Sequence, residues 1–279
     1  MKNYLILFAF LGVVNTAKAN IRADTLVYRK VGNVSLKAYV FRQDDSKHHP
    51  AVLLFHGGAW RIGDATWTCG RAKEFAEKGM VAISVEYRLA NNGLTPIDGV
   101  EDACAAFAWA RKHAKKLGID PGRVAGYGVS AGGHLVAACA TLPMVNGQKV
   151  SETSRPDIML LYSPALNMGH DPYFVSLMAG KADPVSYSPS DFVTKKLPPT
   201  MIIQGEADSI VYARDAIAFR DKAVNTGAKC ILYLYPGVGH LLTHNLKVQY
   251  KDFTASPEDM ADAHQKEDNF LISLGYMSK

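Results

Sequence analysis

Residues 124–138 constrain the fold of this chain more than any other stretch. Their sequence, V-A-G-Y-G-V-S-A-G-G-H-L-V-A-A, joins a short apolar run to a segment of small residues with helical character. Ser130 lies between the two parts and is flanked by Gly128 and Gly132 in a G-x-S-x-G pattern. Only small residues let a strand and a helix pack so closely around a sharp turn. The pattern therefore predicts a strand, a strained turn at Ser130 and a helix.

A turn of this kind is compatible with chemistry or with packing alone. A serine at the N-terminus of a helix lies near backbone N–H groups and the positive end of the helix dipole, which favour a developing negative charge. The same residues are also typical of a plain packing turn or of a phosphate-binding turn. The rest of the chain has to distinguish these alternatives.

Strand-like and helix-like segments alternate along the chain. Continuous apolar runs, typical of strands buried on both faces, lie at 51–55, 81–85, 124–127, 158–162, 201–204 and 229–235. Helical segments are expected at 66–78, 96–117, 211–225 and 259–274, and an edge hairpin at 24–28 and 34–41. The alternation predicts an α/β domain with right-handed crossovers and a mostly parallel, twisted sheet.

Two segments depart from this alternation. Residues 165–197 are rich in Pro, Gly, Asp, Ser and Tyr, and we interpret them as a lid over the site. Residues 1–19 place Lys2 before an apolar run and end in Ala17-Lys18-Ala19, which is typical of a cleaved signal peptide. An uncleaved membrane anchor is the alternative, but the apolar run is short for a bilayer. We therefore expect an exported single domain, 20–279, in the periplasm or outside the cell, without stable membrane anchoring.

Charge and cysteine content narrow the possible partners. Removal of residues 1–19 takes away two lysines and no acidic residue, so the formal net charge falls from +5 to +3. That mild, evenly spread charge does not indicate nucleic-acid binding. The spacing of the cysteines matches no zinc motif, and we expect neither a metal nor a cofactor. The four cysteines are Cys69, Cys104, Cys139 and Cys230. Disulfides are permitted in an exported protein, and buried free thiols are an equal alternative.

Three residues at the ends of predicted strands suggest acyl transfer. Such chemistry needs a nucleophile, a base, an acid that orients the base, and donors for the oxyanion. Ser130 follows the strand 124–127, Asp208 follows 201–204 in Q-G-E-A-D, and His240 follows 229–235 in P-G-V-G-H. In an open α/β sheet, ligands bind at the carboxyl ends of the strands. The order Ser, Asp, His is that of α/β-hydrolases.

Candidate oxyanion donors follow the strand 51–55. The segment H-G-G-A contains Gly57, Gly58 and Ala59, and glycines there let backbone N–H groups approach a ligand. The N–H of Ala131, directly after Ser130, would supply a further donor. A tight turn without a ligand is the alternative. His56 is interpreted as a brace for this loop.

These segments together resemble the esterase/lipase group of α/β-hydrolases that includes hormone-sensitive-lipase-like enzymes, and in particular the BD-FAE-like carbohydrate esterases. The resemblance extends from about residue 24 to the C-terminus. The motifs that carry it are H-G-G-A-W-R-I-G-D (56–64), E-Y-R-L-A (86–90), G-I-D-P-G-R-V (118–124), G-V-S-A-G-G-H-L (128–135), Q-G-E-A-D (204–208) and G-V-G-H (237–240).

The resemblance implies an eight-stranded sheet with helices on both faces and a serine carboxylesterase without a cofactor. Ser130 would be the nucleophile, His240 the base and then the acid, and Asp208 the residue that orients it. Two positions depart from the family pattern. Ala59 replaces a third glycine and is tolerable if its φ is negative, and Glu86 replaces the common asparagine.

The substrate pocket is less well defined by the sequence. Trp60, Tyr87, Tyr127 and Leu241 are near the predicted site along the chain and are candidates to line it, with core or rim packing as the alternative. Glu101 and Asp102 are adjacent carboxyls, as in a glycosidase, but their place early in a predicted helix indicates that they complement its dipole.

By resemblance, the expected substrates are acetyl or feruloyl esters of carbohydrates. An amide-bond hydrolase of the same fold, an arylformamidase or a prolyl-oligopeptidase-like exopeptidase, is the first alternative. A non-catalytic binding protein is the second, although a binding role alone does not require serine, histidine and aspartate at three strand ends.

Overall fold

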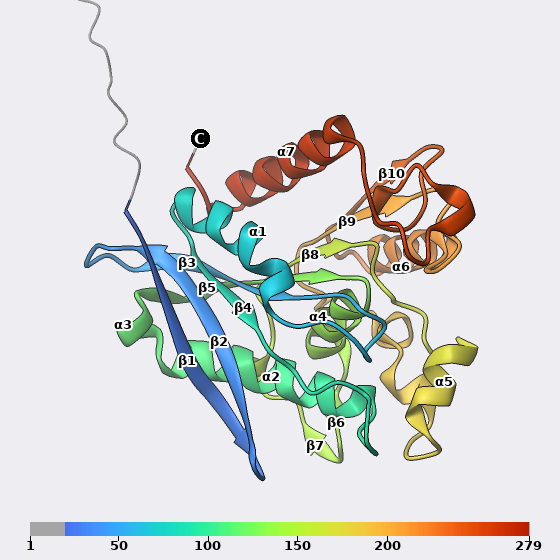
Figure 1. The fold of residues 1–279 in the computed structure, drawn as a ribbon, viewed down its shortest axis with the longest axis horizontal. Coiled ribbons are helices and arrows are strands. Elements are labelled where there is room, and N and C mark those ends of the chain that lie inside the picture. The colour runs from blue at the N-terminus through green and yellow to red at the C-terminus, as the bar shows by residue number, and fades with distance from the viewer. Residues whose placement is uncertain (1–19, 279) are drawn as a thin grey trace, which may run out of the picture.

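The computed structural model describes residues 20–278 of the chain. The predicted signal peptide lies outside these residues and stays a prediction. The main feature is an eight-stranded sheet in the order β1-β2-β4-β3-β5-β8-β9-β10 (Figure 1). The strands are β1 (Ile21–Val31), β2 (Val34–Gln43), β3 (His49–Phe55), β4 (Val81–Val85), β5 (Ile119–Val129), β8 (Ile158–Tyr162), β9 (Thr200–Gly205) and β10 (Cys230–Tyr235).

The sheet is parallel except at one edge. β1 and β2 form the expected antiparallel hairpin, and β2 also pairs antiparallel with β4. Every pairing from β4 to β10 is parallel. The carboxyl ends of β5, β9 and β10 therefore open on the same edge of the sheet, where the predicted nucleophile, acid and base follow them.

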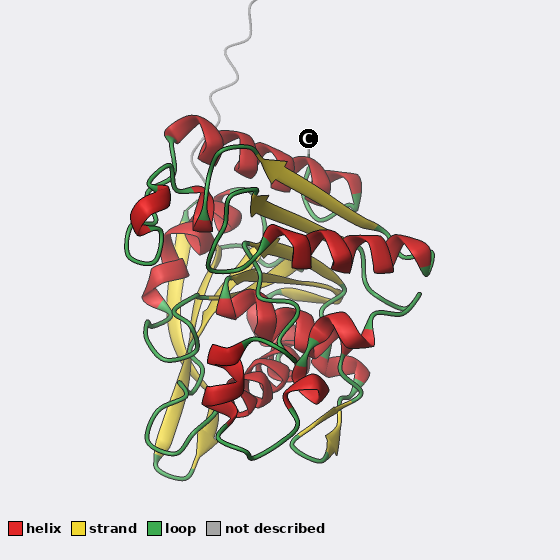
Figure 2. Cartoon of the chain, turned by 90° about the vertical axis from the view of Figure 1, so that its right-hand side faces the viewer, coloured by secondary structure: helices red, strands yellow, loops and turns green. Residues whose placement is uncertain are grey.

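Helices cover both faces, as the alternation predicts (Figure 2). α1 (Thr66–Glu77) and α7 (Pro257–Ser273) pack on one face, and α2 (Pro96–Lys112), α4 (Ala131–Thr141) and α6 (Ala213–Asn225) on the other. β3 shows why the apolar runs are continuous. Leu53 and Phe55 belong to the core under α2 and α4, whereas Val52 and Leu54 belong to the core under α1 and α7.

Two local features differ from the sequence expectation. The helix predicted over 96–117 breaks at His113, whose φ of −105° and ψ of 16° are not helical, and a short α3 (Ala114–Leu117) follows. A small hairpin, β6 (Met144–Val145) and β7 (Gln148–Lys149), follows α4 and has no counterpart in the prediction. Both features are too short to leave a periodic pattern in the sequence.

Residues 165–197, the predicted lid, contain α5 (Pro172–Met178) and two 3-10 turns, Pro184–Tyr187 and Pro189–Phe192. The segment is anchored in the main core, because Phe174 and Met178 are fully buried with residues of α2 and α4. It forms a packed wall at the carboxyl edge of the sheet, beside the start of α6 (Figure 1).

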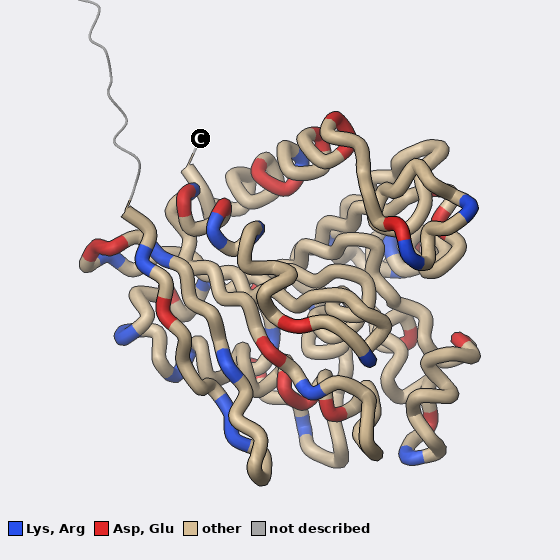
Figure 3. The backbone as a smooth tube through the Cα atoms, in the orientation of Figure 1, with Lys and Arg blue, Asp and Glu red and all other residues tan. Residues whose placement is uncertain are grey.

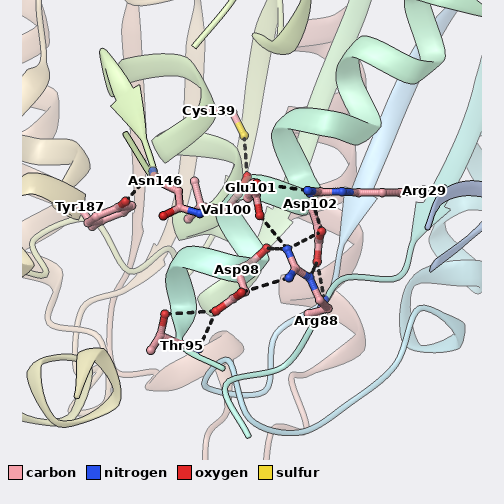
Figure 4. Close-up of polar contacts among 10 residues, drawn as sticks. All are labelled: Arg29, Arg88, Thr95, Asp98, Val100, Glu101, Asp102, Cys139, Asn146 and Tyr187. Carbon is pink, nitrogen blue, oxygen red and sulfur yellow. Dashed lines mark hydrogen bonds and ion pairs between the residues drawn. The ribbon is translucent and has the colours of Figure 1, made fainter. Parts of the chain in front are cut away.

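A cluster of ion pairs joins the loop after β4 to α2 and β1 (Figure 4). Arg88 contacts Asp102 at 2.8 Å, Glu101 at 2.8 Å and Asp98 at 3.0 Å. Arg29 approaches the other oxygen of Asp102 at 2.6 Å. The Asp102 side chain is fully buried, so Glu101 and Asp102 serve the packing of α2, in agreement with a structural role.

Acidic and basic positions are mixed over the same elements (Figure 3). Among residues 20–278, no helix has the length and apolarity to cross a bilayer. Over the same residues, no group of three or more His, Cys, Asp or Glu side chains is arranged to hold a metal ion.

The start of β1 and the C-terminal end lie on the same side of the molecule, away from α5 and α6 (Figure 1).

Candidate active site

The turn between β5 and α4 has the geometry that its sequence predicts. Ser130 adopts φ 52° and ψ −114°, a conformation that costs a non-glycine residue free energy. A Cβ on Gly128 would lie 2.4 Å from the carbonyl oxygen of Gly132, and one on Gly132 would lie 2.1 Å from that of Phe55. The two flanking glycines are therefore required because α4 begins directly against the ends of β5 and β3.

Ser130, His240 and Asp208 form one hydrogen-bonded line. The Ser130 Oγ lies 3.1 Å from His240 Nε2, and His240 Nδ1 lies 2.8 Å from Asp208 Oδ2. All three residues are at most 9% exposed. Because a carboxylate only accepts hydrogen bonds, Nδ1 of His240 carries the proton and Nε2 is free to accept one from Ser130.

The Asp208 carboxylate is held by its own loop. Oδ1 accepts hydrogen bonds from the N–H groups of Ile210 and Val211 at 2.9 and 2.8 Å. Oδ2 accepts one from Nε2 of Gln204, a buried residue of β9, at 2.9 Å, besides the bond from His240. These donors fix which carboxylate oxygen faces the imidazole.

The loops that carry Asp208 and His240 touch each other through their glycines. A Cβ on Gly205 would lie 2.2 Å from the carbonyl oxygen of Gly239, so neither loop could approach the other with a side chain there. The N–H of Ala207 also donates to the carbonyl of Val238 at 2.9 Å. Gln249 joins the same two loops and was missed in the sequence, where a lone glutamine after a 3-10 turn gives no signal.

The predicted oxyanion loop has an unusual backbone at three consecutive positions. φ is +114° at Gly58, +51° at Ala59 and +61° at Trp60. The condition under which an alanine at position 59 is free of strain, a negative φ, is therefore not met, because the loop continues through the left-handed region that favours glycine. Within residues 20–278, the N–H groups of Gly58, Ala59 and Ala131 donate to no protein acceptor and are available to a ligand.

His56 holds this loop. Its Nδ1 lies 2.5 Å from the carbonyl oxygen of Gly57, so this ring nitrogen carries a proton and turns that carbonyl toward itself. In a trans peptide the N–H of Gly58 then points the opposite way. The Tyr87 hydroxyl donates to the His56 carbonyl at 2.9 Å, and the two rings stack at 4.4 Å. Burial lowers the pKa of His56, so the ring is neutral at pH 7.

His134 links the loop to the predicted lid. Its Nδ1 accepts from the Trp60 indole at 3.1 Å, and its Nε2 donates to the Tyr187 carbonyl at 2.8 Å. The ring is fully buried, which lowers its pKa to about 4. The neutral His134 ring, which belongs to α4, therefore connects the oxyanion loop with residues 165–197 through its two nitrogen atoms.

A cavity of about 740 Å³ opens in front of Ser130. Trp60 and Leu241 line the cavity, as expected. Residues of the oxyanion loop, of the serine turn and of the loops after β9 and β10 line it as well. The residues 165–197 supply a wall of Ala165, Asn167, Met168, Asp171 and Tyr173. The cavity therefore lies between the serine turn, the oxyanion loop and the segment predicted to cover the site.

The structure places Tyr87 and Tyr127 away from the cavity, so the pocket expectation is corrected for both. Alternate side chains of a strand face opposite sides of the sheet. Tyr127 thus points toward α1, where its ring meets Phe75 at 5.9 Å. Tyr87 is buried against His56.

Large apolar side chains remain exposed around the mouth of the cavity. The exposed members that line it are Ile62, Trp67, Tyr173, Ile210, Tyr212, Tyr250 and Phe253. Two carboxylates, Asp171 and Asp215, and the Asn167 amide lie among them, with Asn167 Nδ2 donating to Asp215 at 3.1 Å. A solvent-exposed apolar patch of this kind is typical of a binding surface.

Sequence comparison connects residues 52–177 with a family described as having the alpha/beta hydrolase fold. An arylesterase of Saccharolobus solfataricus is 27% identical over 214 residues, which are 68% of this chain and 68% of that protein. A probable isoprenylcysteine alpha-carbonyl methylesterase of Oryza sativa subsp. japonica is 28% identical over 220 residues. That match covers 68% of this chain and 50% of the methylesterase.

A solved structure is similar over nearly the whole length. Esterase Est2 of the planctomycete Thermogutta terrifontis superposes with a TM-score of 0.81 at 27% identity, covering 92% of this chain and 94% of Est2. The same esterase with propionate bound gives a TM-score of 0.80 at 28% identity, covering 92% of this chain and 96% of Est2.

Proposed function

We propose that this chain, a carboxylic ester hydrolase with the α/β-hydrolase fold, forms an acyl-enzyme on Ser130 and acts on acyl esters of carbohydrates. The observation that carries the mechanism is the hydrogen-bonded line from Ser130 through His240 to Asp208, in which Ser130 and His240 line the cavity. A serine hydroxyl is a weak nucleophile until a positioned base removes its proton.

The reaction has two halves. Ser130 Oγ attacks the ester carbonyl carbon while His240 Nε2 takes the hydroxyl proton. As the tetrahedral intermediate collapses, the bond to the leaving alcohol breaks, and Nε2 returns the proton to the alkoxide oxygen. A water then attacks the acyl carbon with Nε2 again as base. The bond to Ser130 breaks, and the serine recovers its proton as the acid leaves.

Backbone N–H groups stabilise the negative charge of each tetrahedral oxyanion. Among residues 20–278 the N–H groups of Gly58, Ala59 and Ala131 have no protein acceptor. Gly58 and Ala59 line the cavity, and Ala131 directly follows Ser130 as the first residue of α4. Donors held in place before the reaction stabilise the developing charge without reorganisation. Gly57 contributes its carbonyl to His56 and so orients the peptide of Gly58.

The residues at the mouth of the cavity support the proposal that the alcohol part of the substrate is a carbohydrate. Exposed aromatic rings such as Trp67, Tyr173 and Tyr212 offer flat apolar faces to the C–H edges of a sugar ring. Asp171 and Asn167 offer hydrogen-bond partners to sugar hydroxyls. The volume of the cavity also suits an acyl group as large as feruloyl.

Export of the enzyme is part of the same proposal. A polysaccharide cannot enter a cell intact, so an esterase that acts on one is needed in the periplasm or outside the cell. The Lys2-containing segment that ends in Ala17-Lys18-Ala19 supports this location. N-terminal sequencing of protein recovered from the periplasm or medium should begin at Asn20, and a retained Met1 would contradict cleavage.

The mechanism is tested by Ser130→Ala. We expect wild-type protein to hydrolyse p-nitrophenyl acetate and the variant to lose about 10³-fold or more of kcat, since the nucleophile is absent. The matched control is Ser273→Ala, because Ser273 is an exposed residue at the end of α7 whose hydroxyl donates to the carbonyl of Phe270 and which does not line the cavity. Equal activity of wild type and Ser130→Ala would contradict the proposed nucleophile.

The substrate class is tested on a panel of esters and amides, in which acetylated xylan and p-nitrophenyl acetate share the acetyl group. Acetylated xylan and methyl ferulate are compared with p-nitrophenyl acetate, N-formylkynurenine and an X-Pro anilide. Serine-dependent release of acetate from xylan supports the carbohydrate proposal, whereas release of ferulate from methyl ferulate supports only an acyl site that accepts the feruloyl group. Turnover of the formamide or the anilide alone would instead assign the chain to amide hydrolysis. Absence of turnover on every substrate would contradict the catalytic proposal.

A further inference from the structure

The loop between His240 and α7 folds back over the two strand-end loops. Residues 243 and 255 pair in an antiparallel bridge that closes it. Gln249 is the one buried side chain among residues 244–255, with 4% of its surface exposed, although the loop lies on the outside of the molecule. A buried amide needs hydrogen-bond partners, because burial without them costs free energy.

The side-chain amide of Gln249 uses its full hydrogen-bonding capacity. Oε1 accepts from the N–H of His240 at 2.9 Å and from the N–H of Ser209 at 3.0 Å. Nε2 donates to the carbonyl of Ala207 at 3.2 Å and to that of Leu246 at 3.3 Å. Two N–H donors and two lone pairs are all that a primary amide offers. The amide therefore joins three separate stretches of backbone.

We propose that Gln249 is a positioning residue that sets the register of the Asp208 loop against the His240 loop. Ala207 and Ser209 flank Asp208, so a single amide holds both neighbours of the acid and the backbone of the base. The 2.8 Å bond between His240 Nδ1 and Asp208 Oδ2 depends on that register. The inference deepens, and rests on, the mechanism proposed above.

The sequence makes room for this amide and keeps it away from substrate. A Cβ on Gly239 would lie 2.5 Å from Gln249 Oε1, so the glycine before His240 is required by Gln249. Tyr250 and Phe253 of the same loop line the cavity, whereas Gln249 does not. Loss of the amide should therefore affect the chemical step, and substrate binding should change little.

The test compares two variants at this position. Gln249→Leu has a similar volume and loses all four hydrogen bonds. Misplaced catalytic groups cost on the order of 100-fold, so we expect kcat on p-nitrophenyl acetate to fall about 10- to 100-fold. KM should stay within about two-fold. Gln249→Glu keeps both acceptor positions for the N–H groups of His240 and Ser209, and its kcat should lie between those of Gln249→Leu and wild type.

The control is Asn245→Ala in the same loop. The exposed Asn245 side chain donates to Asp252 at 3.0 Å, and within residues 20–278 it makes no hydrogen bond to either strand-end loop, so kcat should be unchanged. An equal loss of kcat in Asn245→Ala would mean that any loosening of the loop has this effect, and would overturn the proposal. A rise in KM without a fall in kcat for Gln249→Leu would also overturn it, since the loop would then act on substrate binding.

A spectroscopic measurement separates this inference from the proposed reaction. The Nδ1 proton between His240 and Asp208, whose heavy atoms lie 2.8 Å apart, should give a downfield proton resonance in the absence of substrate. We expect it to shift or broaden in Gln249→Leu and to persist in Asn245→Ala. An unchanged resonance would overturn the positioning role even in an active enzyme. If Gln249→Leu does not fold, Gln249→Glu decides by the same resonance and the same kcat criterion.

Discussion

At the scale of single residues, backbone strain is concentrated around the nucleophile. Ser130 and Ala59 both have φ near +50°, and both line the cavity. An L-residue in the left-handed region costs roughly 1–2 kcal/mol. The surrounding contacts hold both residues there, because α4 fixes Ser130 and the hydrogen bonds of His56 and Trp60 fix the loop of Ala59.

Ala59→Gly should relieve part of this strain. We expect the free energy of unfolding to rise by about 0.5–1 kcal/mol, because glycine tolerates φ of +51° but loses more entropy on folding. Urea denaturation measures the difference. The control is Ala65→Gly, where φ is −61° and the buried methyl is lost, so that stability should fall. A destabilised Ala59→Gly protein would contradict the positive φ.

At the scale of elements, polar side chains fix how the loops after the strands meet the helices. The loop after β4 carries Tyr87 under the oxyanion loop and Arg88 against α2. The N–H of Ala90 then donates to the carbonyl of Trp60 at 2.7 Å. The ion cluster around Asp102 therefore supports the oxyanion loop from a distance, through the backbone of the segment that follows β4.

Asp102→Asn should be strongly destabilising. The change removes a fully buried negative charge that faces Arg88 and Arg29, and breaking such a pair costs about 3–5 kcal/mol. The control is Asp120→Asn, which affects the half-exposed pair with Arg123 and should cost less than about 1 kcal/mol. Urea denaturation measures the free energy of unfolding of both variants. Similar losses in the two would show that the buried ion pairs contribute no more to stability than the half-exposed pair.

Cys104 on α2 and Cys139 on α4 form a second connection between elements. Both are buried, and their sulfur atoms lie 2.6 Å apart. Oxidised glutathione should accept the two electrons and two protons of this thiol pair and leave a disulfide. The chain would then have two titratable thiols after denaturation, Cys69 and Cys230, and a mass lower by two hydrogens. Four thiols after oxidation would contradict the pairing.

At the scale of the whole molecule, His134 is where the serine helix, the oxyanion loop and residues 165–197 meet. Burial lowers its pKa to about 4, whereas an unfolded histidine titrates near 6.5. Between these values the unfolded chain binds a proton that the folded protein does not. The contribution of His134 to the free energy of unfolding therefore rises with pH across this window. This contribution is fully present above about pH 6.5 and is lost as the pH falls toward 4.

The predicted contribution of His134 is on the order of 3 kcal/mol between these pH values. His134→Gln cannot titrate, so its unfolding free energy should fall less on acidification than that of wild type. Urea denaturation at several pH values gives the two curves, and their difference isolates this residue. Parallel curves would contradict a neutral, buried His134.

The sequence was most informative where local chemistry marks a strand end. Glycines beside Ser130, Asp208 and His240 are visible locally, and the fold of a parallel sheet then brings these residues to one edge. Gln249 could not be found in this way, because its role depends on backbone from two distant loops. Tyr127 was misplaced because one residue of register decides which face a strand side chain takes.

The placement of the chain ends has a practical consequence. The start of β1 and the C-terminal end lie on one side, whereas α5 and the start of α6, which border the mouth of the cavity, lie on the other (Figure 1). A linker fused at the C-terminus would therefore tether the molecule with its catalytic opening turned outward. Immobilised on a solid support in this way, the enzyme would keep the mouth of its cavity away from the surface that holds it.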